Sequence, residues 1–302
     1  MPKAIELVGD VGGSSSRWAL LCEDGSVQRF GTEGKRLIGF NPAVGPSTAF
    51  EKQVGGVLRK AFAATGKPRR VAVYGAGCGS PERAARMKTA VSRMLGARNV
   101  SVDTDLMGAA RSTLGNGSGL VLILGTGMNA GWFHRGRLHM PMPSLGWMIG
   151  DEGSGADIGK HVLHDAMHGL VPKKVMQEVF GSARIDRARM TAILAADRPN
   201  AELAGLAWRL STCDLTDYTE KLVSQRFAVL MGILILHVGD RRKHLLHAVG
   251  GIAHAFERQL ALALMGAGFR YAGTAPDPMD GLIAWHQRQR PGLTSRAVRH
   301  PR

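Results

Sequence analysis

The sequence predicts an α/β protein built from two related halves. Residues 4–21 read as an apolar strand, a turn rich in glycine and serine, and a second strand. Residues 119–133 repeat this order about a hundred positions later, with Gly125-Thr126-Gly127 in the turn, and each copy carries a tryptophan on its second strand. This repetition predicts two halves that each offer a loop to one ligand. Two unrelated β-hairpins are the alternative.

Both turns have the composition of a phosphate-binding loop. Glycine has no side chain to hold an anion away from backbone N–H groups. The first turn contains Asp10, Gly12, Gly13 and the serines Ser14 to Ser16. The second is followed by Asp151 and Glu152, two carboxylates set among glycines. We therefore expect a phosphate loop in each half and a substrate loop around the two acids.

Between the two hairpins, helices and strands alternate. Apolar spacing and short apolar runs predict, in order, helix 51–64, strand 71–74, helix 83–95, strand 100–102 and helix 106–114. Asp103 and Asp105 stand at the carboxyl end of the last strand, where open α/β sheets bind their ligands. Either carboxylate is a candidate for chemistry. The alternative for Asp105 is to cap the helix that begins at Leu106.

The second half carries a large helical segment. The pattern predicts, in order, mainly helical residues over 156–180 and 188–236, strand 245–249, the turn Gly250-Gly251, helix 252–264, a turn over 273–278 and helix 279–289. We expect residues 1–114 to form one domain, with helix 279–289 packing back on it, and residues 115–278 to form the other. Residues 291–302 form a polar, basic tail.

Composition excludes several classes of function. The longest apolar run, 227–236, has about half the length of a bilayer span, so we expect a buried helix and no membrane partner. The three cysteines form no C-x-x-C pair, which predicts a reducing, cytoplasmic setting without structural zinc, and Cys78 reads as a buried thiol. A formal net charge of +15 is dispersed in small groups without a nucleic-acid motif, so it suits a polyanionic ligand better than nucleic acid.

One histidine stripe could suggest a metal. His161, His164 and His168 fall on one helix face, with Asp157 and Asp165 nearby. Ligands strung along a single helix rarely close a coordination shell. A partly exposed polar face is therefore the preferred interpretation.

Together these motifs resemble the N-acetylglucosamine kinase group of the BadF/BadG/BcrA/BcrD-type ATPase family, within the sugar kinase/Hsp70/actin superfamily. The segment Ser144–Gly155, SLGWMIGDEGSG, is the most specific piece, and residues 184–238 match only in pattern. The matching segments span nearly the whole chain in the family's order and are residues 10–17, 39–42, 74–78, 104–109, 124–129, 144–155, 249–253 and 278–286.

The resemblance implies two ribonuclease-H-like domains of the actin and hexokinase type, with an interdomain cleft and a helical insertion in the second domain. It also implies ATP and Mg²⁺ as cofactors and an amino sugar as substrate, and a homodimer is common in the family. The implied activity is an ATP-dependent kinase that phosphorylates the 6-hydroxyl of the sugar, with N-acetylglucosamine as the first choice.

The resemblance also assigns roles to individual residues. Asp105 takes the position of the general base and Asp10 that of the acid that orders Mg²⁺. The implied substrate-binding residues are Asn41, Asp105, Gly127, Asn129 and Asp151, to which the residues themselves add Trp147 and Glu152. The implied ATP-binding residues are Gly12, Gly13, Ser14, Ser15, Ser16, Thr126, Gly127, Gly250 and Gly251.

Some of these roles have structural alternatives. Asp151 could stabilise a turn, and Trp147 could pack in the core rather than form a pocket wall. For Glu152, a salt bridge and a substrate contact are equally open. The first loop also departs from the family, because Ser14 replaces a threonine and Ser15 replaces a basic residue. Arg17 restores a cation there only if the loop turns it inward.

Other functions remain open on the same fold. N-acetylmuramate or glucosamine could be the acceptor, and the positive charge mildly favours the acidic one. A dehydratase-activating ATPase would need cysteines for an iron–sulfur cluster, and a ROK-type kinase would carry a Cys/His zinc cluster; the sequence has neither pattern. A sugar sensor or a non-kinase ATPase could keep the loops without the base, whereas Asp105 favours catalysis.

Overall fold

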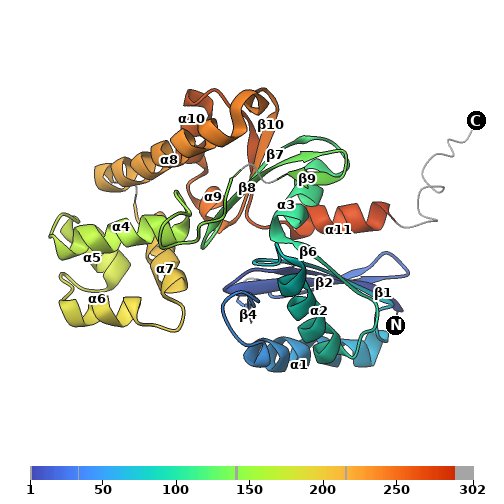
Figure 1. Ribbon diagram of the computed structural model, residues 1–302. Helices are drawn as coiled ribbons and strands as arrows, with labels where there is room; N and C mark the ends of the chain where they lie inside the picture. Colours follow the sequence, from blue (N-terminus) through green and yellow to red (C-terminus); the bar gives the residue numbers. More distant parts are fainter. Residues whose placement is uncertain (1, 33, 140–141, 215, 290–302) are drawn as a thin grey trace, which may run out of the picture. The chain divides into compact units, whose positions relative to one another are not determined.

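The computed structural model describes residues 2–32, 34–139, 142–214 and 216–289. The predicted tail, 291–302, lies outside this range. The chain divides into two compact units, coloured along the sequence in Figure 1. Unit 1 comprises Met1–Gly115 together with Pro278–Arg302, and unit 2 comprises Asn116–Asp277.

Unit 1 is built on a mixed sheet with the strand order β3-β2-β1-β5-β6, and β4 pairs with β2. β1 is antiparallel to β2 and parallel to β5, which is parallel to β6. The two glycine-turn strands are thus neighbours at the centre of the sheet. The strands are β1 (Ala4–Val11), β2 (Ser15–Cys22), β3 (Val27–Phe30), β4 (Leu37–Ile38), β5 (Arg70–Gly75) and β6 (Val100–Thr104).

Helices cover both faces of this sheet. Because side chains alternate along a strand, Leu7 and Leu20 pack with α1 (Thr48–Thr65) and α2 (Pro81–Leu95). On the opposite face, Val8 and Leu21 pack with Leu282 of α11 (Met279–Arg288), beside α3 (Asp105–Leu114). Helix α11 therefore completes the core of unit 1.

Unit 2 repeats the architecture of unit 1. Its sheet has the order β11-β10-β7-β8-β9, in which the first strand again lies between its antiparallel hairpin partner and a parallel strand. The same order and directions in both sheets confirm the prediction of two related halves. The strands are β7 (Gly119–Leu124), β8 (Met128–His134), β9 (Arg137–His139), β10 (Leu245–Val249) and β11 (Arg270–Ala275).

A helical segment is inserted between β9 and β10. This segment and the two helices that follow β10 share one apolar core with Leu120, Leu122 and Leu124 of β7. The predicted helical insertion is therefore present. The helices are α4 (Gly155–Met167), α5 (Lys173–Phe180), α6 (Arg187–Leu194), α7 (Pro199–Thr212), α8 (Asp217–Val238), the 3-10 helix η1 (Gly239–Lys243), α9 (Gly251–Ala255) and α10 (Glu257–Gly266).

The long apolar helix α8 has two different sides. By length and composition alone, Asp217–Lys243 could cross a bilayer, with a mean hydropathy of 1.7 over its most apolar window. Phe227, Leu230 and Leu234 are nevertheless buried in the core of unit 2. The expected buried helix over 227–236 is thus correct for one face only, since Leu236 is 82% exposed.

Two predicted elements near the end of unit 2 were wrong. The expected turn over 273–278 overlaps strand β11, which pairs in parallel with β10. Its sequence, RYAGTA, lacks both an apolar run and clear alternation, because this edge strand is only partly buried. The expected helix 252–264 is two helices, because the backbone of Phe256 (φ −114°, ψ 34°) breaks the helical path.

Candidate active site

The first glycine turn of unit 1 is hydrogen-bonded to the segment Gly39–Phe40. The carbonyls of Gly12 and Ser14 accept hydrogen bonds from Phe40 N–H and Gly39 N–H, each at 3.1 Å. In a trans peptide the C=O and the following N–H point in opposite directions. The N–H groups of Gly13 and Ser15 therefore point away from that segment. A side chain at Gly39 would overlap the Gly12 carbonyl, so glycine is required there.

A cation stands beside this turn. Asp10 and Arg17 face each other across the β1–β2 ladder, with Arg17 Nη1 3.8 Å from Asp10 Oδ2. The guanidinium thus lies next to the turn that contains Ser15. Mg²⁺ prefers carboxylate and water oxygens and needs only one or two carboxylates, so Asp10 fits that role by donor chemistry.

Ser16 has a different environment from Ser14 and Ser15. It is fully buried, its hydroxyl donates to Ile38 O at 2.8 Å, and it accepts from the indole N–H of Trp18 at 3.1 Å. Because side chains alternate between the two faces of a strand, Ser16 and Trp18 of β2 point into the same core. Its side chain therefore supports the unit 1 fold, contrary to the phosphate-binding role that we expected for it.

Asn41 lies against two glycine turns. Its Oδ1 accepts a hydrogen bond from Ala43 N–H at 2.9 Å, and a side chain at Gly77 (φ +73°) would overlap the Asn41 amide. Its Cβ also lies 4.0 Å from the Cβ position of Gly13. The structure thus brings this predicted substrate residue next to the first phosphate turn.

Asp105 is the first residue of α3 and does not cap it. Thr104 is the N-cap, because its hydroxyl accepts from Met107 N–H at 3.1 Å, and Asp105 Oδ1 accepts from Leu106 N–H at 2.8 Å. Burial raises the pKa of Asp105 to about 6 despite these backbone hydrogen bonds. The carboxyl group can therefore take up and release a proton near neutral pH.

The two neighbours of Asp105 are less suited to proton transfer. Asp103 is engaged in an ion pair with Arg111, 2.8 Å between Oδ2 and Nη1. Burial, followed by the charge of Asp105, raises the pKa of Cys78 to about 12, so this thiol stays protonated. Of the two candidate bases, the geometry favours Asp105.

The second glycine turn, between β7 and β8, is fixed by the start of α4. Gly155 N–H donates to Gly125 O at 2.8 Å and Ala156 N–H donates to Thr126 O at 3.1 Å. By the same trans-peptide geometry, the N–H groups of Thr126 and Gly127 point away from α4. In both units, the carbonyls of the glycine turn are therefore bound by another segment of the same unit.

Asp151 lies directly against this second turn. Its Oδ2 is 2.7 Å from the Cβ position of Gly127, so a larger residue at 127 would displace the carboxylate. Its backbone occupies the left-handed region (φ +58°), which is rare for residues other than glycine and concentrates at functional sites. Burial raises the pKa of Asp151 to about 6, although Met128 N–H donates to it, and the charges of Glu152 and Asp157 add to the rise.

Asp157 holds the loop that carries Asp151. It is 2% exposed, and its Oδ2 accepts from Gly153 N–H at 2.9 Å and from Arg226 Nε at 2.8 Å. Sequence reasoning saw Asp157 only as a neighbour of the histidine stripe. The spacing Ser154-x-x-Asp157, typical of a helix start, was the signal that could have found it.

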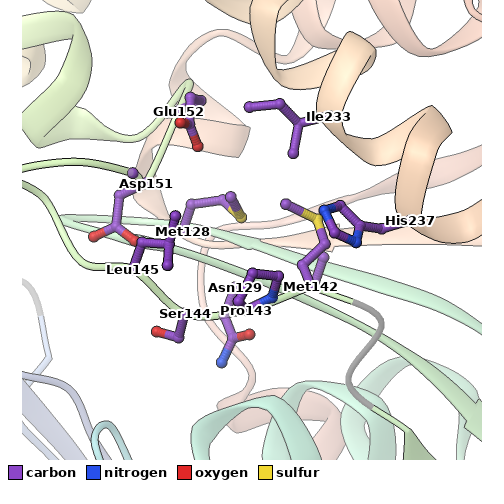
Figure 2. Close-up of a pocket in the computed structure, with 12 residues that line it drawn as sticks. Met128, Asn129, Met142, Pro143, Ser144, Leu145, Asp151, Glu152, Ile233 and His237 are labelled. Atoms are coloured by element: carbon purple, nitrogen blue, oxygen red, sulfur yellow. The ribbon is translucent and has the colours of Figure 1, made fainter.

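A small pocket of about 60 Å³ opens beside Asp151 in unit 2 (Figure 2). Asn129, Asp151 and Glu152, three of the residues predicted to bind substrate, line it, whereas Trp147 packs partly buried against the core and is outside the lining. Figure 2 shows Met128 and Met142 between Asp151 on one side and His237 on the other. Sequence reasoning missed Ile233 and His237, because no local pattern shows that α8 reaches the pocket.

Gly250 and Gly251 lie beside the second turn. A side chain at Gly250 (φ +127°) would overlap the carbonyl of Leu124, the last residue before that turn. Only glycine allows this close approach of the two backbone segments. The predicted adenosine turn is therefore next to the predicted phosphate turn.

The histidine stripe is not a metal site in the described part of the chain, where no group of three or more His, Cys, Asp or Glu could hold a metal ion. His161 Nδ1 is 2.9 Å from Asp157 O, and the rings of His164 and His168 lie tilted to each other, with 4.6 Å between their centroids.

No protein-family model matches the chain, and no curated protein matches its sequence. Its structure is similar to a candidate N-acetylglucosamine kinase from Porphyromonas gingivalis, with 26% identity, a TM-score of 0.80, and 94% of this chain and 99% of that chain covered. A second candidate N-acetylglucosamine kinase, from Chromobacterium violaceum, gives 20% identity and a TM-score of 0.70 over the same shares. A ROK family glucokinase from Streptomyces griseus, solved with glucose and AMPPNP, gives 15% identity, a TM-score of 0.54, and coverage of 94% and 98%.

Proposed function

We propose that this chain, which has the two-domain fold of the sugar kinases, is an ATP-dependent kinase for the 6-hydroxyl of an amino sugar, with N-acetylglucosamine as the first candidate. The observation that carries the proposal is Asp105, a carboxyl group with a pKa raised to about 6, at the start of α3. A non-catalytic sensor has no need of such a group. The fold by itself would not decide the function.

Phosphoryl transfer asks the protein mainly for positioning and charge stabilisation. In unit 1, the glycine turn and Arg17 would contribute to phosphate binding. In unit 2, the turn Gly125-Thr126-Gly127 would do the same. Asp10 is the residue that would hold Mg²⁺, which would supply positive charge to the phosphate groups. Asp105 would accept the proton of the sugar hydroxyl as the oxygen bonds to phosphorus.

The pocket of unit 2 supports a neutral or cationic acceptor. Its lining includes the carboxyl groups of Asp151 and Glu152 and, among the residues that the structure describes, neither lysine nor arginine. An acidic acceptor such as N-acetylmuramate would meet like charge there. The overall positive charge of the chain mildly favours that acid, whereas the carboxyl groups of the pocket favour a neutral or cationic acceptor.

A coupled assay over N-acetylglucosamine, glucosamine, N-acetylmannosamine and N-acetylmuramate tests the proposal. We expect ATP consumption that depends on the sugar and is highest with N-acetylglucosamine. Hydrolysis that is independent of sugar would indicate an ATPase instead, and sugar binding without ATP turnover would indicate a sensor. Mass spectrometry of the product with 6-deoxy-N-acetylglucosamine as the control acceptor identifies the phosphorylated hydroxyl.

A further inference from the structure

Trp208 is an exposed tryptophan with no role in the site described so far. It lies on α7, where its neighbours Leu206, Ala207 and Leu210 are buried in the core of unit 2. Its own side chain is 44% exposed. By contrast, Trp18 is fully buried, and Trp132 is flanked by the rings of His134 and His244.

The indole lies beside the turn Gly250-Gly251. Its Cζ3 atom is 3.7 Å from the Cβ position of Gly251, which is ordinary van der Waals contact. Helices α7 and α9 are in contact at this point. An alanine at 251 would thus touch the ring, and glycine leaves the space beside the ring open.

One face of α7 extends from the second glycine turn to Trp208. Ala204, one helical turn before Trp208, has its Cβ 2.9 Å from the Cβ position of Gly155, and that position is 3.1 Å from Gly125 O. Residues four apart lie on the same helix face, about 6 Å along the axis. Small residues therefore lie along this face of α7, between the second glycine turn and the indole of Trp208.

We propose that Trp208 is the stacking platform for the adenine base of the nucleotide, an inference that rests on the proposed kinase function. An exposed indole gains by covering its face with another aromatic system, and a purine offers such a face without charge. The phosphate groups would be bound by Thr126 and Gly127, and the base would lie over the open space at Gly251. Trp208 is thus a binding residue for ATP, apart from Asp105 and the sugar pocket.

Two substitutions in the full chain test the platform. Trp208→Ala removes the ring and Trp208→Phe keeps an aromatic face. Calorimetry then compares ADP with inorganic tripolyphosphate, a probe that has phosphates but no base. We expect Trp208→Ala to weaken ADP binding about tenfold or more and to leave tripolyphosphate binding within about twofold, whereas Trp208→Phe retains most of the ADP affinity. KM for ATP should rise with kcat nearly unchanged.

Leu262→Ala is the matched control, because Leu262 is an exposed apolar residue of the same unit, 54% exposed on α10. It should change neither affinity. Equal ADP affinity in Trp208→Ala and the wild type, while sugar is still phosphorylated, overturns the platform alone. Equal loss of ADP and tripolyphosphate binding in Trp208→Ala also overturns it. A wild-type chain that binds neither ligand overturns the proposed kinase function itself.

Discussion

The hydroxyl of Tyr74 and Nε2 of His286 are 2.9 Å apart in the core of unit 1, although 212 positions separate the two residues in sequence. His286 Nδ1 is in turn 3.2 Å from Glu6 Oε1, and Arg111 donates to the Tyr74 hydroxyl at 3.0 Å. Burial raises the pKa of Tyr74, so its hydroxyl stays protonated. This network joins α11 to β1, β5 and α3, the helix that begins with the candidate base.

Replacement of Tyr74 by phenylalanine should loosen α11. The change removes the hydroxyl that forms hydrogen bonds with His286 and Arg111. A buried polar group left without a hydrogen bond lowers the free energy of unfolding by about 1–3 kcal/mol. Urea unfolding should show a loss of that size, and amide hydrogen exchange should accelerate in 279–288. Tyr218→Phe is the matched control, because it breaks a tyrosine–carboxylate bond to Asp165 in unit 2. If both variants leave exchange in α11 unchanged, the network does not hold the helix.

Replacement of Asp105 by asparagine should lower kcat by about three orders of magnitude, because both the proton acceptor and its positioning are lost. KM for ATP should change little. Asp103→Asn is the control, since it removes the neighbouring carboxylate that is paired with Arg111. It should retain most of the activity. Asp105→Asn with a tenth of wild-type turnover, or a larger loss in Asp103→Asn, would contradict the assignment of the base.

The pH dependence of kcat/KM should show an acidic limb near pH 6. Asp105 accepts a proton only in its ionised form, and burial raises its pKa from the ordinary value of 3.8 to about 6. Activity should therefore rise between about pH 5 and 7 and then level off. Rate measurements over that range check the midpoint. A limb near pH 4 would show that the carboxyl group is ionised as in water.

Asp151→Asn should stabilise the fold at neutral pH. Because the folded-state pKa of Asp151 is raised to about 6, the folded chain holds its proton more tightly than the unfolded chain, and stability falls as pH rises from about 4 to 6. Asparagine removes the buried charge and tolerates a positive φ. We expect a gain of about 1–2 kcal/mol near pH 7.5 and none near pH 4. Thermal unfolding at the two pH values measures it, and equal gains at both would contradict the cause.

Two helical glycines of unit 2 should respond in opposite directions to alanine. A side chain at Gly159 would overlap the backbone of Leu203, where α4 and α7 meet, so Gly159→Ala should cost about 1–3 kcal/mol or more. Gly232 on α8 has open space around its Cβ position, so Gly232→Ala should gain up to about 1 kcal/mol through helix propensity. Denaturant unfolding of the pair tests this, and a neutral Gly159→Ala would show that the helices can separate.

Local patterns predicted the parts of the fold whose signals are local. The glycine turns interrupt apolar strands, and helices such as α1 and α2 keep an unbroken apolar face, so both were visible in the sequence. Strand β11 was not, because a partly buried edge strand needs neither alternation nor an apolar run. The break at Phe256 leaves helical spacing almost intact on both sides, so periodicity could not show it.

The candidate site was predictable only where a motif carried it. Asp105 and Asp151 stand out by their position after a strand and among glycines. The burial of the Ser16 side chain depends on the register of β2. The ion pair of Asp103 depends on Arg111, which lies in the helix that follows it. His237 and Trp208 belong to helices whose only sequence signal is apolar spacing. Their placement follows from tertiary packing, which no window of sequence contains.

The return of α11 to unit 1 has a consequence for synthesis on the ribosome. Unit 2 is one continuous stretch and can fold once its last strand has emerged, whereas unit 1 is completed only by residues made after unit 2. Until then, the sheet face with Val8, Ala19 and Leu21 lacks its cover of Met279, Leu282 and Ile283. The first half of the chain to be translated is therefore the second to be finished, and its uncovered sheet face is the surface that a nascent-chain chaperone would meet.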